Sequence, residues 1–168
     1  MSWSRRTLCS VEGTSIEEWT HRFFVPAPTF LDMRGAVVAN GSLLSPCKEV
    51  PVRSERLGSP FLSKPPWQRR DRVEGTRNSF CALGFMAARF DVFNPFEGMH
   101  VFVNMFMVRH VLKIDREAIA IFRDRHDTTS EFERHMWSLF ATKRLDIRDV
   151  DPPLQVDRLI VLPSSGVS

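Results

Sequence analysis

Residues 45–78 constrain the fold of this chain more than any other segment, because no regular structure fits them. The segment holds five of the eleven prolines, and neither a helical nor a strand-like period of apolar residues persists along it. Proline removes a backbone donor and interrupts helices and central strands. We therefore expect a long exposed loop, and a loop of this length in a compact domain is usually functional or disordered.

The patterned sequence before this loop predicts a helix and a hairpin. Thr14 and Glu17 match a capping box, so a short helix is expected from Thr14 until Pro26 and Pro28 end it. Asn40–Gly41 then stands between two apolar pairs. Both residue types tolerate positive φ, which indicates a tight β-hairpin.

The segment after the loop begins with two long apolar stretches, residues 79–93 and 99–114. They are rich in Phe, Val and Met, and the connector "NPFEG" carries Asn, Pro and Gly. This arrangement predicts an antiparallel β-hairpin. The first stretch also fits a helical period, through Ala82, Leu83, Met86, Ala87 and Phe90.

The last third of the chain carries two helix starts and a strand. Asp115 is a plausible cap for a helix over about 116–125. Thr128–Glu131 and Ser130–Glu133 both match a capping box, which predicts a second helix there. Pro152 and Pro153 interrupt the chain before residues 154–162, which read as a final strand.

These patterns together predict an α+β fold, in which an antiparallel sheet of β-hairpins packs against two or three helices. The length of 168 residues suits one domain. We expect a flexible arm at 1–13, a single domain at 14–163 that contains the loop at 45–78, and a frayed tail at 164–168.

The basic character of the chain belongs to its first half. The formal net charge is +3, with 13 Lys+Arg against 8 Asp+Glu in residues 1–89, and 10 against 12 in residues 90–168. Most of the basic residues are arginine, whose planar guanidinium suits phosphate and carboxylate groups. A GC-rich or overlapping gene would give the same bias without any function.

The long loop is the candidate binding site. Arginines with interleaved aromatics can neutralise phosphates and stack on unpaired bases. An anionic membrane surface is an alternative, because charge combined with Trp and Phe also acts there. A docking peptide in a polyproline II conformation and a plain solvated loop stay open too. The candidate residues are Arg53, Arg56, Lys64, Trp67, Arg69, Arg70, Arg72 and Arg77.

The sequence thus predicts a non-enzymatic basic protein that binds RNA or an anionic membrane surface and self-associates. Matrix-like, nucleocapsid-like and RNA-binding accessory proteins are of this physical type. The alternative is an adaptor that docks a protein partner through the Pro/Trp/Arg loop. A second alternative is an enzyme that uses His126 with Asp127, or Asp91 with Glu97 around a divalent cation. No cofactor, metal or catalytic residue is assigned.

The three cysteines, Cys9, Cys47 and Cys81, are odd in number and widely spaced. This spacing predicts reduced thiols and an intracellular protein, cytoplasmic or nuclear. No signal peptide is expected, and apolar runs of about ten residues are too short to span a bilayer. The "NGS" at residues 40–42 matches a glycosylation acceptor, but we interpret it here as a turn.

Overall fold

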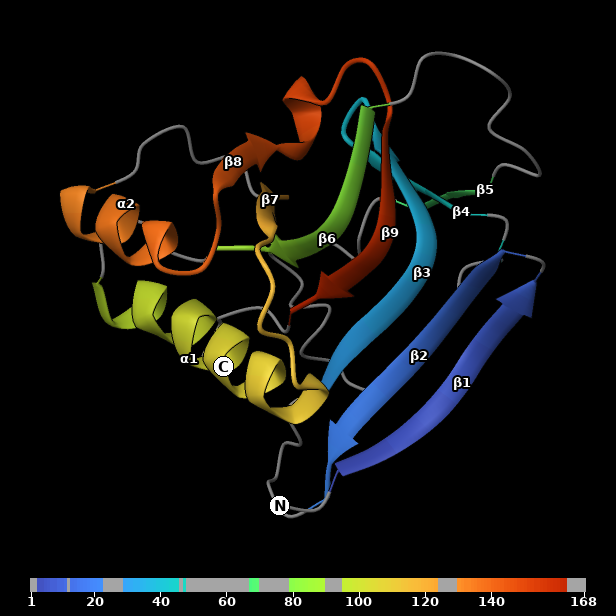
Figure 1. Cartoon of the computed structure of the whole chain (residues 1–168), viewed down its shortest axis with the longest axis horizontal. Helices are drawn as coiled ribbons and strands as arrows, with labels where there is room; N and C mark the ends of the chain where they lie inside the picture. The colour runs from blue at the N-terminus through green and yellow to red at the C-terminus, as the bar shows by residue number, and fades with distance from the viewer. Residues whose placement is uncertain are drawn as a thin grey trace.

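The computed structural model describes residues 3–11, 13–22, 29–45, 47, 67–69, 79–89, 95–123 and 130–162. In these ranges the chain forms a nine-stranded sheet with two helices beside it (Figure 1). The elements are β1 (Trp3–Val11), β2 (Thr14–His21), β3 (Thr29–Ala39), β4 (Ser42–Ser45), β5 (Trp67–Arg69), β6 (Ser79–Ala87), α1 (Pro95–Leu112), β7 (Ile119–Phe122), α2 (Glu131–Ser138), β8 (Lys143–Asp146), the 3-10 helix η2 (Ile147–Asp149) and β9 (Leu154–Val161).

The sheet has an antiparallel half and a parallel half. Its main strand order is β1-β2-β3-β9-β6-β7-β8, with antiparallel pairing from β1 as far as β9 and parallel pairing from β9 to β8. Strand β4 branches from β3 in an antiparallel hairpin, and β5 pairs with β4 in parallel. The last strand of the chain therefore joins the two halves.

The expected α+β fold with a sheet of hairpins is wrong, since the described part is mostly sheet and half of that sheet is parallel. Parallel neighbours cannot be joined by a tight turn and need a crossover. Here α1 connects β6 to β7, and α2 connects β7 to β8. Both helices lie on the same side of the sheet, next to each other (Figure 1).

The first two segments of the chain differ from the prediction. Most of the expected flexible arm forms β1, and the expected helix from Thr14 is strand β2. Along β2 the buried residues Thr14, Ile16 and Glu18 alternate with half-buried ones. This period of two, completed by pairing to β1 and β3 on both sides, outweighs the local capping-box match.

The hairpin expected over 79–114 is also wrong, because only its first arm is a strand. Val101, Phe102, Met105 and Val108 are buried at helical spacing, and residues 95–112 form α1. Proline is tolerated in the first turn of a helix, so Pro95 begins α1 instead of marking a turn. The helix expected over 116–125 is replaced by β7, a short strand between β6 and β8.

Three local predictions are confirmed. Asn40 (φ 46°) and Gly41 (φ 75°) both have positive φ in the turn between β3 and β4, as a two-residue hairpin requires. Ser130 caps α2, where its Oγ accepts a hydrogen bond from the Glu133 backbone N–H at 3.1 Å. Residues 154–161 form the final strand, β9.

The apolar core has one layer on each face of the sheet. One cluster fills the space under α1 and α2, with Phe85, Phe102 and Trp137 among its members. The other, which includes Leu31 and Met33, lies on the opposite face. Gly35 (φ 65°) interrupts the alternation of side chains along β3, so that Met33 and Ala36 pack in the same core cluster although they are three residues apart. A Cβ at Gly35 would lie 2.2 Å from the Gly13 carbonyl oxygen.

A disulfide corrects the prediction of three reduced cysteines. Cys9 on β1 is bonded to Cys47 just after β4, with their Cα atoms 6.1 Å apart, and Cys81 is a free thiol. Burial raises the pKa of the Cys81 thiol, which donates a hydrogen bond to the Leu83 carbonyl at 3.0 Å. The thiol argument for an intracellular protein therefore fails. Neither described helix is long and apolar enough to cross a membrane.

Candidate binding surfaces

The residues predicted to bind an anionic partner fall mainly outside the described ranges. Trp67 and Arg69 lie on β5, where they are the register partners of Leu43 and Ser45 of β4. The loop residues thus gain a fixed backbone position at one short strand. The candidates that lie outside the described residues are Arg53, Arg56, Lys64, Arg70, Arg72 and Arg77.

The residues of the enzyme alternatives are not brought together in the described structure. His126, Asp127 and Asp91 lie outside the described residues, and Glu97 falls in the first turn of α1. His100 and His110 lie on α1, where ten residues of helix rise about 15 Å. Within the described ranges, no group of three or more His, Cys, Asp or Glu residues could hold a metal ion.

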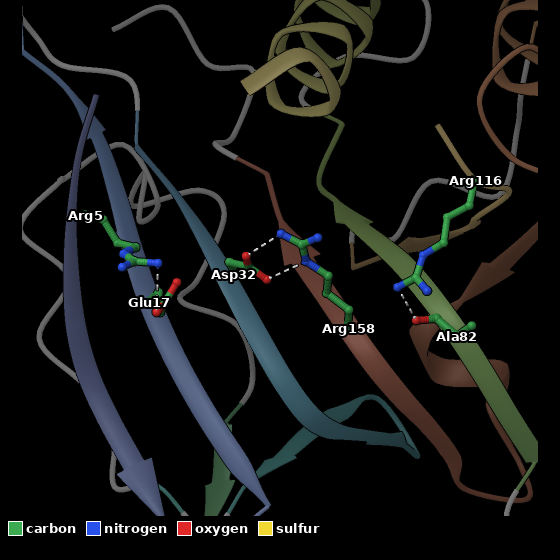
Figure 2. Close-up of polar contacts among 6 residues, drawn as sticks. All are labelled: Arg5, Glu17, Asp32, Ala82, Arg116 and Arg158. Atoms are coloured by element: carbon green, nitrogen blue, oxygen red, sulfur yellow. Dashed lines mark hydrogen bonds and ion pairs between the residues drawn. The ribbon is translucent and has the colours of Figure 1, made fainter. Parts of the chain in front are cut away.

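A row of charged side chains crosses the sheet on the helix side, from β1 to β6 (Figure 2). Arg5 on β1 is 3.7 Å from Glu17 on β2. Arg158 on β9 donates from Nε and NH2 to the two carboxylate oxygens of Asp32 on β3, at 3.0 and 2.7 Å. Arg116, which follows α1, donates to the Ala82 carbonyl of β6 at 3.1 Å. We call Arg5, Arg34, Arg116 and Arg158 the arginine row.

Arg34 is the member of the arginine row with the greatest freedom to bind a ligand. It lies directly opposite Arg158 in the β3–β9 register, and its side chain is exposed. Among the described residues it has no hydrogen-bond or ion-pair partner. Two arginines opposite each other in the register, of which only Arg158 is held by a carboxylate, leave positive charge that suits a phosphate or carboxylate.

Aromatic rings border the arginine row at the end of β2. Trp19 and Phe30 are stacked, with ring centroids 5.9 Å apart, and the Arg5 guanidinium lies 5.7 Å from the Trp19 centroid. The neighbouring basic residue, Arg6, points to the other face, where it pairs with the buried Glu18 at 2.9 Å. The N-terminal arginines are therefore divided between the two faces of the sheet.

A second surface is apolar. Six large hydrophobic side chains are exposed in the described part of the chain, and all except Val11 lie on α1, on α2 or at the C-cap of α2. Phe106 is 66% exposed and Leu139, the C-cap of α2, is 63% exposed. We call this surface the helix ridge, and its residues are Met99, Val103, Phe106, Phe132 and Leu139.

Aromatic packing beneath the helix ridge holds the two helices together. Phe102 of α1 contacts both Trp137 and Phe140, with centroid distances of 4.9 and 6.0 Å. Trp137 also meets Phe122 of β7 edge-on at 4.8 Å. The exposed side chains above them are thus carried on a rigid, well-packed base.

A buried ion pair anchors α2 to the sheet. Arg89, just after β6, is 3.2 Å from Glu133, and both side chains are at least 94% buried. The same Glu133 oxygen accepts a hydrogen bond from Trp137 Nε1 at 3.2 Å, and the Arg89 guanidinium lies over the Phe122 ring. Each charge is thus paired and hydrogen-bonded, as burial requires.

Asp146, at the end of β8, lies in the same positive surroundings. A side-chain hydrogen bond from Arg148 is the main reason that the pKa of this carboxyl is lowered, and Arg89 contributes at longer range. Neither this pair nor the helix ridge was predicted from the sequence. The spacing of Met99, Val103 and Phe106 would have shown the ridge if the segment had been read as a helix.

No protein-family model, curated protein or solved structure matches this chain.

Proposed function

We propose that this protein is a non-enzymatic binding domain that self-associates by docking its helix ridge against a second copy of the chain. The observation that carries this proposal is that five of the six exposed large apolar side chains among the described residues lie on α1, on α2 or at the C-cap of α2, with Phe106 and Leu139 the most exposed. Grouped apolar side chains on a surface are typical of protein-interaction sites, whereas scattered ones need no explanation.

The composition and support of the ridge favour a protein partner. Two of its five residues are phenylalanine and one is methionine, types that are enriched at protein interfaces. The ridge stands on the fixed contacts of Phe102 and Trp137, so little conformational entropy is lost when a partner binds.

Exposed charges on α2 favour a second copy as the occupant. Glu131 and Arg134 are both exposed on α2, one turn apart, and Glu131 directly precedes Phe132 in the sequence. In a two-fold interface the same patch meets itself, so the acid of one copy can face the base of the other. A patch that carries both signs is suited to this pairing.

The experiment is sedimentation equilibrium of the full chain over a range of concentrations. We expect a reversible dimer that Phe106→Ser or Leu139→Ser weakens at least tenfold. Val11→Ser is the matched control, because Val11 is an exposed apolar residue on β1, away from the ridge. Circular dichroism checks that each variant is folded.

Two results would contradict the proposal. One is a wild-type chain that is monomeric even at about 1 mM, which corresponds to a dimerisation free energy weaker than about −4 kcal/mol. The other is a dimer that both ridge variants leave intact.

The second candidate function is binding of an anionic polymer, with single-stranded RNA as the ligand. Its support is the exposed Arg34 beside Arg158, together with the Trp19–Phe30 stack at the border of the arginine row. The arginine-rich segment 45–78 would add contacts to the phosphates.

Fluorescence anisotropy with labelled single-stranded RNA tests this candidate as a function of salt. Arg34→Ala, and separately the triple change of Arg69, Arg70 and Arg72 to alanine, should weaken binding and lower the salt slope. Arg6→Ala is the control, since Arg6 faces the opposite side of the sheet. If neither RNA nor anionic vesicles bind at low salt, the candidate is wrong; vesicle binding alone would assign the surface to a membrane.

A further inference from the structure

The turn between β3 and β4 presents an asparagine that satisfies a modification sequence. Asn40, Gly41 and Ser42 form the pattern Asn-X-Ser, and Asn40 is exposed at the tip of the hairpin. The backbone N–H of Asn40 donates to Val150 at 3.2 Å and that of Gly41 to Ile147 at 2.9 Å. These bonds use the main chain, so the Asn40 carboxamide has no partner among the described residues.

The Cys9–Cys47 disulfide is an independent observation that points in the same direction. Structural disulfides form and persist in oxidising compartments such as the lumen of the endoplasmic reticulum and the extracellular space. N-linked glycans are added to Asn-X-Ser/Thr sequences at the surface of proteins that pass through those compartments. The disulfide thus indicates a compartment in which an Asn-X-Ser sequence can be glycosylated.

We propose that Asn40 is an N-glycosylation site that takes an oligosaccharide from a lipid-diphosphate donor. In the transfer, Nδ2 of Asn40 forms a bond to C1 of the first sugar and loses a proton. The bond between C1 and the diphosphate oxygen breaks, and the lipid diphosphate leaves with the electron pair. No oxidation or reduction is involved.

The folded hairpin requires that glycan transfer occur before the hairpin closes. Ser42 is buried in β4 and Asn40 is held at positive φ, so the three residues cannot adopt an extended conformation in the folded chain. Glycan transfer therefore precedes closure of the hairpin. Because Cys47 follows the hairpin directly, formation of its bond to Cys9 competes with the transfer.

The hairpin tip lies apart from α1. It is hydrogen-bonded to η2, and these elements lie together at the top of the view in Figure 1, while α1 lies at the lower left. A glycan on Asn40 would thus be attached away from the helix that carries Met99, Val103 and Phe106.

To test the proposal, the full chain is expressed with a cleavable leader in cultured mammalian cells, so that it enters the secretory pathway. We expect one electrophoretic shift that peptide-N-glycosidase removes, with Asn40 converted to Asp in the peptide mass spectrum. Ser42→Ala should abolish the shift while leaving the turn residues Asn40 and Gly41 in place. Ser42→Thr should retain it, and Asn104→Gln, which alters an asparagine outside any such pattern, should not affect it.

A second measurement distinguishes an asparagine that is not an acceptor from a chain that fails to fold. Cys47→Ser should raise the glycosylated fraction, because hairpin closure is no longer reinforced by the disulfide. Non-reducing peptide mapping of the wild type should show the Cys9–Cys47 bond. An unglycosylated luminal chain that carries this bond would overturn the proposal, as would a glycan that persists in Ser42→Ala or a luminal chain with both thiols free.

Discussion

The edge of the antiparallel half and the parallel half of the sheet differ in how deeply an ion pair is buried. In the edge pair, Arg5 on β1 with Glu17 on β2, the Arg5 side chain is 60% exposed. Under α2, the Arg89–Glu133 pair is almost fully buried. A pair in water is screened and weak, whereas a buried pair leaves a costly unpaired charge when one partner is lost.

The difference arises from how each half is covered. An antiparallel sheet can leave one face in water, but a parallel sheet needs crossover helices that bury it. Here the crossovers α1 and α2 supply both the burial and the exposed helix ridge. We expect single substitutions to have large effects in the parallel half and small ones at the antiparallel edge, with the disulfide as the exception.

Glu133→Ala is the most severe test of the comparison. It leaves the Arg89 guanidinium buried without its counter-ion and removes the acceptor of Trp137 Nε1. The free energy of unfolding should fall by about 3–5 kcal/mol, measured by urea denaturation followed by tryptophan fluorescence. Glu131→Ala, in the same turn but exposed, should cost less than about 1 kcal/mol. Equal losses would show that burial does not make the Arg89–Glu133 pair more important than an exposed acid of the same helix.

Loss of the disulfide should have the second-largest effect on the free energy of unfolding. Replacing Cys9 and Cys47 by serine releases a constraint across a sequence separation of 38 residues, and the unfolding free energy should fall by about 2–4 kcal/mol. Cys81→Ser, which alters the free thiol, is the control and should change it by less than about 1 kcal/mol. Reduction of the wild type should reproduce the double variant, and a reduced wild type with unchanged stability would refute the prediction.

Asp32→Asn tests the junction between the halves, where β3 meets β9. The change removes the charge that accepts two hydrogen bonds from Arg158, and a loss of about 2 kcal/mol is expected from thermal or chemical denaturation. The loss should be smaller than for Glu133→Ala, because the Arg158 side chain is 15% exposed and can still reach water. A larger loss than for Glu133→Ala would place the main electrostatic anchor in the antiparallel half.

Asp146 predicts that the stability of the parallel half depends on pH. The hydrogen bond from Arg148 lowers the pKa of this carboxyl in the folded chain. Its stabilising contribution is therefore complete above the unfolded-state pKa and is lost as the pH falls through the folded-state pKa. Asp146→Asn should flatten this part of the acid unfolding curve. An acid unfolding curve that Asp146→Asn leaves unchanged would exclude Asp146 as a source.

The smallest effect is expected at the antiparallel edge. Arg5→Ala breaks an exposed ion pair with a separation of 3.7 Å, and the unfolding free energy should change by less than about 1 kcal/mol. The change should shrink further in high salt, which screens exposed charges. A loss comparable to that of Asp32→Asn would show that the edge pair is coupled to the rest of the charged row.

Local signals in the sequence predicted local structure well. Asn40–Gly41 specified its turn and Ser130 with Glu133 specified the start of α2, because each depends on contacts within four residues. The same kind of signal misled at Thr14 and at Asp115, where strands form. In both places pairing with strands distant in the sequence decides the conformation, and local propensity cannot report it.

The candidate sites, too, could be predicted only where they depend on local sequence. The loop arginines could be named from composition alone, but Arg34 beside Arg158 arises only from the β3–β9 register, across most of the chain. The helix ridge was hidden because residues 99–112, rich in Phe, Val and Met, fit a buried strand as readily as a helix.

The sequence by itself determined the hairpin at Asn40–Gly41, the cap at Ser130, the final strand and the basic bias of the first half. Only the tertiary structure decided the parallel pairing of β9 with β6, the bond between Cys9 and Cys47, and the burial of Arg89 with Glu133. The physical reason is that turns and caps are satisfied within a few residues, whereas strand partners, disulfides and buried charges require groups that only the folded chain brings together.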